Sequence, residues 1–413
     1  MNLIKTSFYT SISTAITFIS GFVVVKVVAV KIGPEGIALV GQFQNTIAIL
    51  TMLATAAITN GVVKYLAEYK DDPVKREQII NTSFLIVFFS SLIISVFVMS
   101  ASGYLSNAAF KSKNFWMVYF LFGMFMLAIS FNSVFSAILN GLKEIKKLTI
   151  INICSSSVGV AITVFAAYVF GLEGVLLAST ATAIIIFVIN IFIFNKLGIK
   201  CKPDFKSWDK RLAKMLSAFS LMGIVTGFVA PAMQILVRDR IILQFSVIDA
   251  GYWQAVTKIS DYYLGFITSV LVVYYMPRLS EIQSKAELRN EIAKGYKMIL
   301  PIVGAIAFLI WLLKGFIIPI LFSSEFLPMK PLFTFQLLGD FFKIGSWLLA
   351  YLMIAKAMTR IFIVTEITFA VSYVILSYYF MDHYGIIGAT YSFCINYGLY
   401  WIMMWFLMKK KLE

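Results

Sequence analysis

Two polar patterns with the same spacing lie inside two long apolar stretches of the chain, in mirror-image order. The first pattern is Gln-x-x-x-Lys-x-x-Asp and the second is Gln-x-x-x-Asp-x-x-Lys. Positions i, i+4 and i+7 share one face of a helix, so each pattern predicts a single polar stripe. The residues are Gln254, Lys258 and Asp261 in the first stripe and Gln336, Asp340 and Lys343 in the second.

Ionisable side chains in a membrane helix usually face a bundle interior or a watery cavity, since each costs about 2.5 kcal/mol or more in lipid. The alternative to a functional site is a self-neutralising Lys–Asp pair that fixes helix packing. A second stripe and the two accompanying glutamines favour a continuous wet face. We therefore expect a cavity in which the two glutamines and Lys258 and Lys343 bind an anionic cargo, while Asp261 and Asp340 serve ion coupling or gating.

Other charged residues also lie inside apolar stretches. Lys26 and Lys64 are further candidates for substrate binding, although their long stems would also allow them to snorkel to the headgroups. Lys314 is similar. Glu366 lies about five residues inside its stretch, where it is either a charge of the first helical turns or a titrating group. It joins the two aspartates as a candidate for ion coupling.

The composition predicts an all-α membrane protein. The chain has 413 residues, of which 60% are hydrophobic and only 13% charged, and its mean hydropathy is +0.89. Apolar stretches of this length cross a hydrocarbon core of roughly 30 Å as helices. Twelve such spans are predicted, at 7–30, 37–66, 79–100, 116–138, 149–169, 175–195, 215–237, 250–277, 297–321, 331–355, 361–381 and 386–408.

The positive charges predict the orientation and the lobes. With both termini in the cytoplasm, the cytoplasmic segments hold 24 Lys and Arg, counting Lys297 at the first position of its span, and the opposite loops hold six. The predicted location is the bacterial inner membrane. The longest cytoplasmic loop is basic and falls at the midpoint, which predicts an N-terminal six-helix lobe at 1–195, a linker at 196–214 and a C-terminal six-helix lobe at 215–413. The exported-side loops are short, and the longest is 101–115.

Other classes of function have little support. The net charge of +15 lies in the loops, which favours membrane lipids rather than nucleic acid as a partner. One histidine and three scattered cysteines predict no metal site, and no cofactor is expected. No phosphate-binding or nucleophile motif occurs, so no catalytic residue is expected either.

Glycine-containing turns indicate duplicated halves. Gly36 and Gly251 are 215 residues apart, and Gly174 and Gly385 are 211 residues apart. Similar offsets at two places favour two repeats of six spans each, an arrangement common in transporters.

Several blocks in order carry a resemblance to a known family. They are GPEG at 33–36, NGVVKY at 60–65, SWD at 207–209, LSAF at 216–219, GYWQ at 251–254, ISD at 259–261, FQLLGD at 335–340 with Lys343, and IAKA at 354–357. The chain resembles the Wzx-type flippases for undecaprenyl-pyrophosphate-linked oligosaccharides, within the multidrug/oligosaccharidyl-lipid/polysaccharide exporter superfamily. It is most similar to members that move enterobacterial common antigen lipid III or a related O-antigen unit.

The resemblance implies two six-helix lobes forming a V around a central cationic cavity that opens alternately to the two sides. The implied cargo is an undecaprenyl-pyrophosphate-linked oligosaccharide, moved from the cytoplasmic to the periplasmic leaflet. A polysaccharide polymerase and a chain-length regulator are candidate partners. Three alternatives stay open: a drug antiporter of the same superfamily, a membrane glycosyltransferase or polymerase, and a non-transporting scaffold of a polysaccharide assembly complex.

Overall fold

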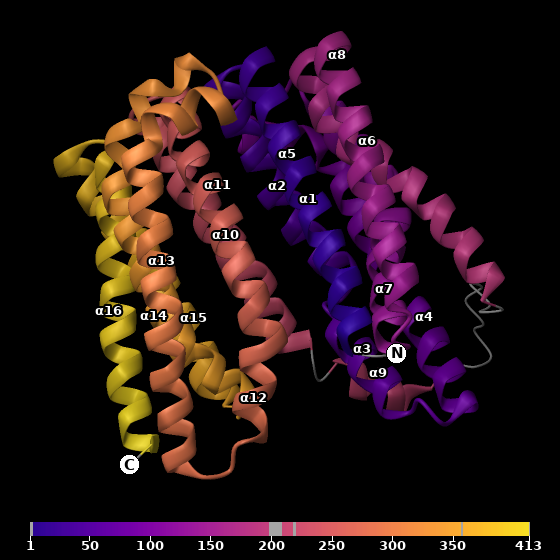
Figure 1. Ribbon diagram of the computed structural model, residues 1–413. Helices are drawn as coiled ribbons and strands as arrows, with labels where there is room; N and C mark the ends of the chain where they lie inside the picture. The colour runs from indigo at the N-terminus through magenta and orange to yellow at the C-terminus, as the bar shows by residue number, and fades with distance from the viewer. Residues whose placement is uncertain (1–2, 198–208, 218–219, 357, 413) are drawn as a thin grey trace. The chain divides into compact units, whose positions relative to one another are not determined.

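The computed structural model describes residues 3–197, 209–217, 220–356 and 358–412 (Figure 1). Within these residues all regular structure is helical, so the predicted all-α fold is confirmed. Each of the twelve predicted spans coincides largely with helical segments where the structure describes it, and the span at 37–66 is interrupted between Ala54 and Thr59. Most of the predicted linker, 196–214, lies outside the described residues.

The chain forms two compact units. The first comprises Met1–Ile32 and Leu39–Ala232, and the second comprises Gly33–Ala38 and Met233–Glu413. The units therefore divide inside two helices, after Ala38 near the start of the helix Pro34–Ala54 and close to Pro231 in the helix Ser220–Gln244, rather than at the basic linker. The predicted division into six-helix lobes at 1–195 and 215–413 remains a prediction.

The first unit consists of consecutive helices, most of them joined by short connections. Its helices are α1 Leu3–Lys31, α2 Pro34–Ala54, α3 Thr59–Glu68, α4 Pro73–Ser100, α5 Ser102–Phe110, α6 Trp116–Met124, α7 Met126–Gly141, α8 Ile145–Lys196, α9 Lys210–Ser217 and the first part of α10 Ser220–Gln244. The predicted loop at 101–115 thus contains a helix, α5. A core around Phe84, Phe135 and Phe194 joins α4, α7 and α8 through edge-on and tilted ring contacts.

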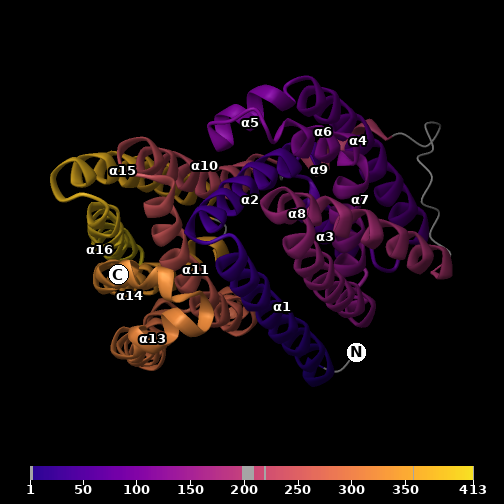
Figure 2. The ribbon, with the colours of Figure 1, turned by 90° about the horizontal axis from the view of Figure 1, so that it is seen from above.

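The second unit is a bundle whose central helices are nearly all apolar. It contains the end of α10, then α11 Val247–Val270, the π-helix Leu271–Tyr275, α12 Met276–Glu281, α13 Lys285–Leu321, the 3-10 helix Ser324–Leu332, α14 Phe333–Ala355, α15 Thr359–Tyr384 and α16 Ile387–Leu412. Seen from above, α14 lies between α13 and α16 (Figure 2). The helix α13 begins twelve residues before the predicted span at 297.

The helices are long and apolar enough to make this a multi-pass membrane protein. Seven described helices pass on length and composition, and an eighth span results if α6 and α7, which meet at a bend of 56°, are counted together. The exact count of twelve spans stays a prediction. Many exposed side chains on these helices are large and apolar, as expected for lipid contact. Examples are Ile93, Phe165, Phe308, Phe316 and Ile375.

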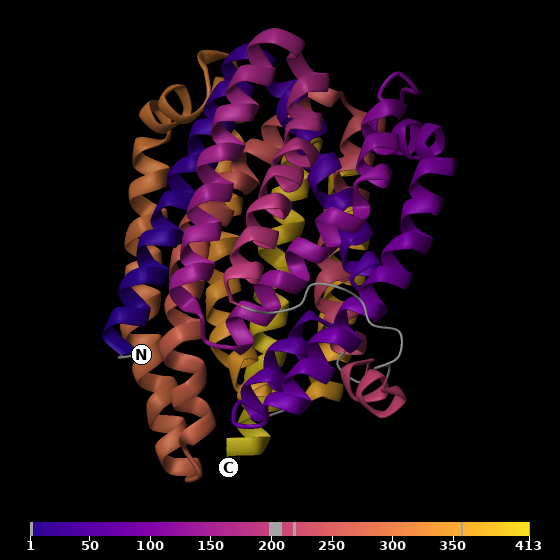
Figure 3. The ribbon, with the colours of Figure 1, turned by 90° about the vertical axis from the view of Figure 1, so that its right-hand side faces the viewer.

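Two helical hairpins turn at glycines that are 214 residues apart. Gly171 has φ 58° and ψ −137°, and it divides α8 into two arms. The arms run antiparallel: a Cβ on Gly174 would meet the Ala166 carbonyl oxygen at 2.6 Å (Figure 3). Gly385, with φ 67° and ψ −157°, ends α15 in the same way before α16. The two hairpins have equivalent turn glycines 214 residues apart, which supports the predicted internal repeat. In this comparison the residue equivalent to Gly385 is Gly171 rather than Gly174.

Replacing Gly171 with alanine tests the backbone requirement of this turn. No atom lies within 4 Å of a Cβ built at Gly171, so the cost arises from the conformation alone. We expect Gly171→Ala to destabilise the protein by about 1–3 kcal/mol, since residues with a side chain rarely adopt this conformation. Thermal unfolding of the purified protein in detergent measures the change.

The matched control is Gly103→Ala in α5, where a Cβ also meets no atom within 4 Å and φ is not positive. This variant should unfold at or above the wild-type temperature, because alanine favours helix more than glycine does. Equal unfolding temperatures for the two variants would contradict the proposed role of Gly171.

Candidate functional site

A buried arginine is the first polar centre of the second unit. Arg238 lies on α10, is 0% exposed and donates a hydrogen bond to Oε1 of Gln254 on α11. Its guanidinium also lies over the ring of Trp253, 5.5 Å from the centroid. Asp239 and Asp261 contribute attractive charge to it. Arg238 lies just beyond the predicted span 215–237, whereas α10 continues to Gln244.

A buried carboxylate is the second polar centre. Asp340 on α14 is 0% exposed. It accepts hydrogen bonds from the Ser260 hydroxyl at 2.6 Å and the Tyr263 hydroxyl at 2.8 Å. The Gln336 amide donates to the other carboxylate oxygen at 3.4 Å and to the Ser260 hydroxyl oxygen at 3.3 Å. Four side chains from α11 and α14 therefore form one closed hydrogen-bonded cluster.

Lys343 lies one helical turn from this cluster, beside three aromatic rings. Its Nζ is 4.9 Å from the ring centroid of Trp347 and 5.5 Å from that of Tyr397. The third ring, Phe393, is 5.7 Å away. The side chain is half-buried. A cation that interacts with ring faces keeps part of its electrostatic stabilisation away from water.

The exposure of the first stripe increases along α11 from Gln254 to Asp261. Gln254 is 2% exposed, Lys258 is half-buried and Asp261 is exposed. Lys258 lies within electrostatic range of both Asp261 and Arg238. Glu366 on α15 is half-buried and accepts a hydrogen bond from the Tyr400 hydroxyl at 3.3 Å. The two predicted stripes thus divide into buried polar contacts and accessible charges.

In the first unit, Lys26 on α1 is half-buried and Lys64 on α3 is exposed. The Lys64 ammonium lies 5.0 Å from the ring centroid of the neighbouring Tyr65. Neither lysine is among the residues that line the pocket described next. Their assignment to substrate binding is a proposal taken up below.

A break between α2 and α3 is a feature that the sequence did not predict. Ala56 and Ala57 have φ of 49° and 51°, a left-handed conformation that is unfavourable for residues with a side chain. The freed backbone carbonyls find hydroxyl donors. Ser90 donates to the Ala54 oxygen at 2.6 Å, and Ser220 donates to the Ala56 oxygen at 2.7 Å. The break is therefore held by side chains of α4 and α10.

A pocket of about 560 Å³ opens at this break. Its polar lining consists of neutral hydroxyl and amide groups, with glycines of α10 providing space. Irregular backbone inside a membrane protein is tolerated where it lines a wet cavity or is buried in protein. The polar residues are Gln44, Thr51, Thr55, Thr59, Asn60 and Ser133.

The described residues contain no group of three or more His, Cys, Asp or Glu side chains that could hold a metal ion. The chemistry that the site offers is therefore hydrogen bonding and fixed charge. Lysines and an arginine can compensate an anionic group, and neutral hydroxyls and amides can bond to other hydroxyls.

The family is decided by a match that extends over most of the chain. Residues 3–283 fit a family model described as polysaccharide biosynthesis protein. The chain belongs to this family. It is 33% identical over 402 residues to the lipid III flippases of Escherichia coli (strain K12) and Shigella flexneri, covering 97% of this chain and 96% of each relative. The resemblance that the sequence blocks indicated is confirmed.

Solved structures share the fold. An inward-facing multidrug resistance MATE family transporter of the MOP superfamily superposes with a TM-score of 0.77 at 14% identity, covering 96% of this chain and 94% of the other. A MOP superfamily transporter from Pyrococcus furiosus gives a TM-score of 0.72 at 15% identity, covering 99% and 95%. Together with the flippase relatives, these matches show that this member of the polysaccharide biosynthesis family is a transporter rather than an enzyme.

The Arg238–Gln254 contact generates a stability prediction. Gln254→Ala leaves a fully buried guanidinium without its amide acceptor, which should destabilise the second unit by about 1.5–3 kcal/mol. Gln254→Glu keeps an acceptor at the same place and should retain most of the stability. Thermal unfolding in detergent compares the two variants.

The control for a charge contact at the surface is Arg240→Ala, whose guanidinium pairs with exposed Asp382 at 2.6 Å. That variant should cost about 1 kcal/mol or less. If Gln254→Ala unfolds no earlier than Arg240→Ala, the buried contact does not support the fold as described.

Proposed function

We propose that this transporter is a flippase for an undecaprenyl-pyrophosphate-linked oligosaccharide, an enterobacterial common antigen or O-antigen repeat unit. The observation that carries the proposal is the match to the lipid III flippases over 97% of the chain. A large polar cargo with a pyrophosphate group also fits the two kinds of polar surface described above, one basic and one neutral.

The proposed transport runs from the cytoplasmic to the periplasmic leaflet of the inner membrane by alternating access. The excess of Lys and Arg in the predicted cytoplasmic segments supports this orientation, with both termini in the cytoplasm. The undecaprenyl chain stays in lipid, since hydrocarbon gains nothing from entering a polar cavity. Only the pyrophosphate and the sugars then need a polar route across the membrane.

The pyrophosphate is assigned to the lysines. Two negative charges or more in a medium of low dielectric constant need fixed positive charge close by, since isolated charges are very costly there. Lys26, Lys64, Lys258 and Lys343 are the proposed cationic contacts. Lys258 and Lys343 are both half-buried, and the Lys343 ammonium lies beside three aromatic rings.

The predicted glutamine contacts take a different form in the structure. Gln254 and Gln336 are each 2% exposed and hydrogen-bonded to Arg238 and Asp340 respectively. This burial supports a positioning role, in which the two amides hold the charged groups of α10 and α14. In the first unit, the neutral pocket at the α2–α3 break is the proposed place for sugar hydroxyls.

Ion coupling is assigned to Asp261, Asp340 and Glu366. Asp340 is the best-supported of the three, because its carboxylate is fully buried and contacted by three donors. Adding or removing a positive ion here changes the charge balance of the α11–α14 contact. Lys343 and Asp261 are the charged neighbours that experience this change. After the cargo has been released, the altered α11–α14 contact would favour the return of the transporter to its cytoplasm-facing conformation.

The charge model is tested by complementation of a strain that lacks its lipid III flippase. Lys258→Ala and Lys343→Ala should each abolish complementation, because each removes a cation needed to compensate the pyrophosphate. The matched control is Lys314→Ala on α13, another half-buried lysine beside an aromatic ring, with its Nζ 4.6 Å from the ring centroid of Trp311. Lys314 should be dispensable. Membrane levels of all three variants are quantified in parallel, and full activity of both Lys258→Ala and Lys343→Ala would refute the model.

The coupling model is tested with proteoliposomes containing the lipid-linked oligosaccharide and an imposed proton or sodium gradient. Wild-type flipping should accelerate with one of the gradients, and Asp340→Asn should flip at a rate that neither gradient changes. Asparagine keeps the shape and an acceptor for Ser260 and Tyr263. Asp382→Asn, at the exposed pair with Arg240, serves as the control and should respond like wild type. A gradient response retained in Asp340→Asn would remove Asp340 from the coupling step.

A further inference from the structure

A pocket on α13, α14 and α16 lies apart from the polar centres described above. It has a volume of about 540 Å³. The residues on α13 occupy the i, i+3, i+4, i+7 and i+8 positions from Arg289, the last of them being Lys297, so they lie on one helical face. Those on α16, namely Trp401, Trp405 and Met408, likewise share a face. The pocket therefore lies between two facing helical surfaces, with Leu349 of α14 between them.

The apolar part of the pocket is rigid. The Trp401 indole donates a hydrogen bond to the Tyr296 hydroxyl at 2.9 Å, and the two rings stack with centroids 5.9 Å apart. The Tyr296 hydroxyl in turn donates to the Gly345 carbonyl at 2.7 Å. The polar atoms of both aromatic side chains are thus satisfied within the protein. What remains toward the pocket is an apolar surface.

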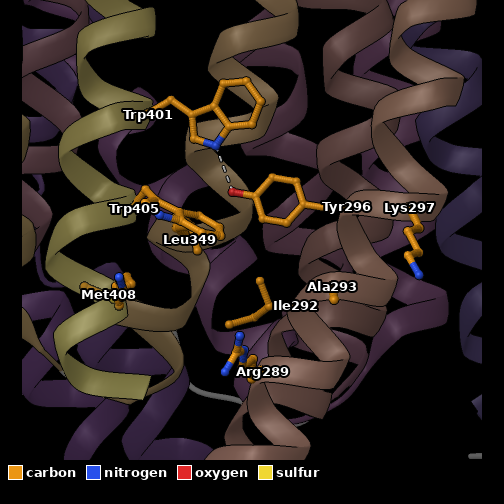
Figure 4. Close-up of a pocket in the computed structure, with 10 residues that line it drawn as sticks. Arg289, Ile292, Ala293, Tyr296, Lys297, Leu349, Trp401, Trp405 and Met408 are labelled. Atoms are coloured by element: carbon orange, nitrogen blue, oxygen red, sulfur yellow. Dashed lines mark hydrogen bonds between the residues drawn. The ribbon is translucent and has the colours of Figure 1, made fainter. Parts of the chain in front are cut away.

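The two ends of the pocket differ in chemistry. Figure 4 shows Trp401 and Tyr296 at one end and Arg289 at the other, with Trp405 and Ile292 between them. Lys409 follows Met408 in the last turn of α16 and also lines the pocket. Among the lining residues that the structure describes, three are basic and none is acidic. An amphipathic ligand with an anionic head group matches a pocket that is apolar at one end and basic at the other.

The pocket lies where the head of a lipid is expected. The predicted spans begin at 297 on α13 and end at 408 on α16, so Arg289 and Lys409 lie outside the hydrocarbon, Tyr296 lies at its edge, and Trp401 and Trp405 lie within it. Trp and Tyr are enriched at this level of a bilayer. Basic pockets between helices at a membrane surface bind anionic lipid headgroups.

We propose that this pocket binds an anionic glycerophospholipid of the surrounding leaflet, which the proposed orientation makes the cytoplasmic one. Its phosphate group contacts Arg289 and Lys409, and one acyl chain lies against Trp405, Ile292 and Leu349. The lipid occupies the space between α13 and α16 and ties the ends of these two helices together.

The test uses brominated lipids, which quench tryptophan fluorescence on contact. Trp405 is 54% exposed and lines the pocket, so it reports on the occupant. The full chain is reconstituted in phosphatidylcholine vesicles containing increasing fractions of dibrominated phosphatidylglycerol or dibrominated phosphatidylcholine. Phosphatidylglycerol should reach half-maximal quenching at a mole fraction roughly fivefold or more lower, since each basic residue near the membrane surface favours anionic lipid by about that factor.

Three variants assign this excess quenching to the pocket. It should disappear in Trp405→Phe, which removes the reporter, and in the double variant Arg289→Gln/Lys409→Gln, which removes the two proposed phosphate contacts and leaves Lys297 as the remaining basic residue of the described lining. Ala293→Phe narrows the pocket without changing its charge and should reduce the excess as well. The matched control, Lys146→Gln/Lys294→Gln, removes two exposed lysines that do not line the pocket and should quench like wild type.

Each contrary outcome overturns the proposal. Equal quenching by the two lipids would show that no anionic headgroup is selected. Loss of the excess in the control variant would show a general effect of surface charge. If undecaprenyl phosphate removes the excess at a lower mole fraction than unlabelled phosphatidylglycerol does, the pocket is a site for the cargo lipid instead.

Discussion

The arrangement of helices in the second unit depends on the need to compensate two charged side chains buried in a low-dielectric interior. Arg238 and Asp340 are both 0% exposed, and neither could be retained there without partners. α11 supplies partners to both: Gln254 for the arginine, and Ser260 with Tyr263 for the aspartate. α11 is therefore fixed to α10 on one side and to α14 on the other. A shift of α11 would break hydrogen bonds to at least one of the two buried charges.

This arrangement explains why one predicted stripe has such unequal exposure. Gln254, Lys258 and Asp261 lie within about 60° of arc on α11, so their side chains point in similar directions. The three side chains differ in which neighbouring residues pack over them. Gln254 is buried against Arg238, whereas Asp261 is exposed. Ser260 and Tyr263 point to the other side of α11, toward α14. The helix therefore carries polar groups on two faces, of which the sequence pattern revealed one.

The fold could be predicted from the sequence to the extent that hydropathy determines it. Apolar stretches of membrane length place the helices, and the prediction of an all-α fold is confirmed, with the break after α2 as an exception. The end of α10 was not predictable in this way. The sequence Arg238-Asp239-Arg240 resembles a loop because three charges adjoin, yet α10 continues through it to Gln244. Arg238 can stay inside only because its acceptor lies sixteen residues further along the chain, and no local pattern contains that information. The apolar residues after Arg240 were the available signal.

The break after α2 escaped prediction for a related reason. Thr55 to Ile58 contain no glycine or proline, and alanine favours helix, so local propensity predicts continuity. The left-handed alanines cost about 1 kcal/mol or more each. Two serines from distant helices, Ser90 and Ser220, supply the hydrogen bonds that the carbonyls would otherwise lack. Tertiary contacts thus override propensity at the point where a neutral polar pocket opens.

The three parts of the proposed cargo correspond to three different chemical environments in this chain. Pyrophosphate needs fixed positive charge, sugars need neutral donors and acceptors, and the polyprenyl chain needs only lipid. Lys258 and Lys343 supply positive charge, the pocket at the α2–α3 break presents hydroxyls and amides, and the outward faces of the helices are apolar. A carrier of small cations would need none of the first and little of the second. The separation of charge from neutral polarity therefore favours a cargo that is itself divided in the same way.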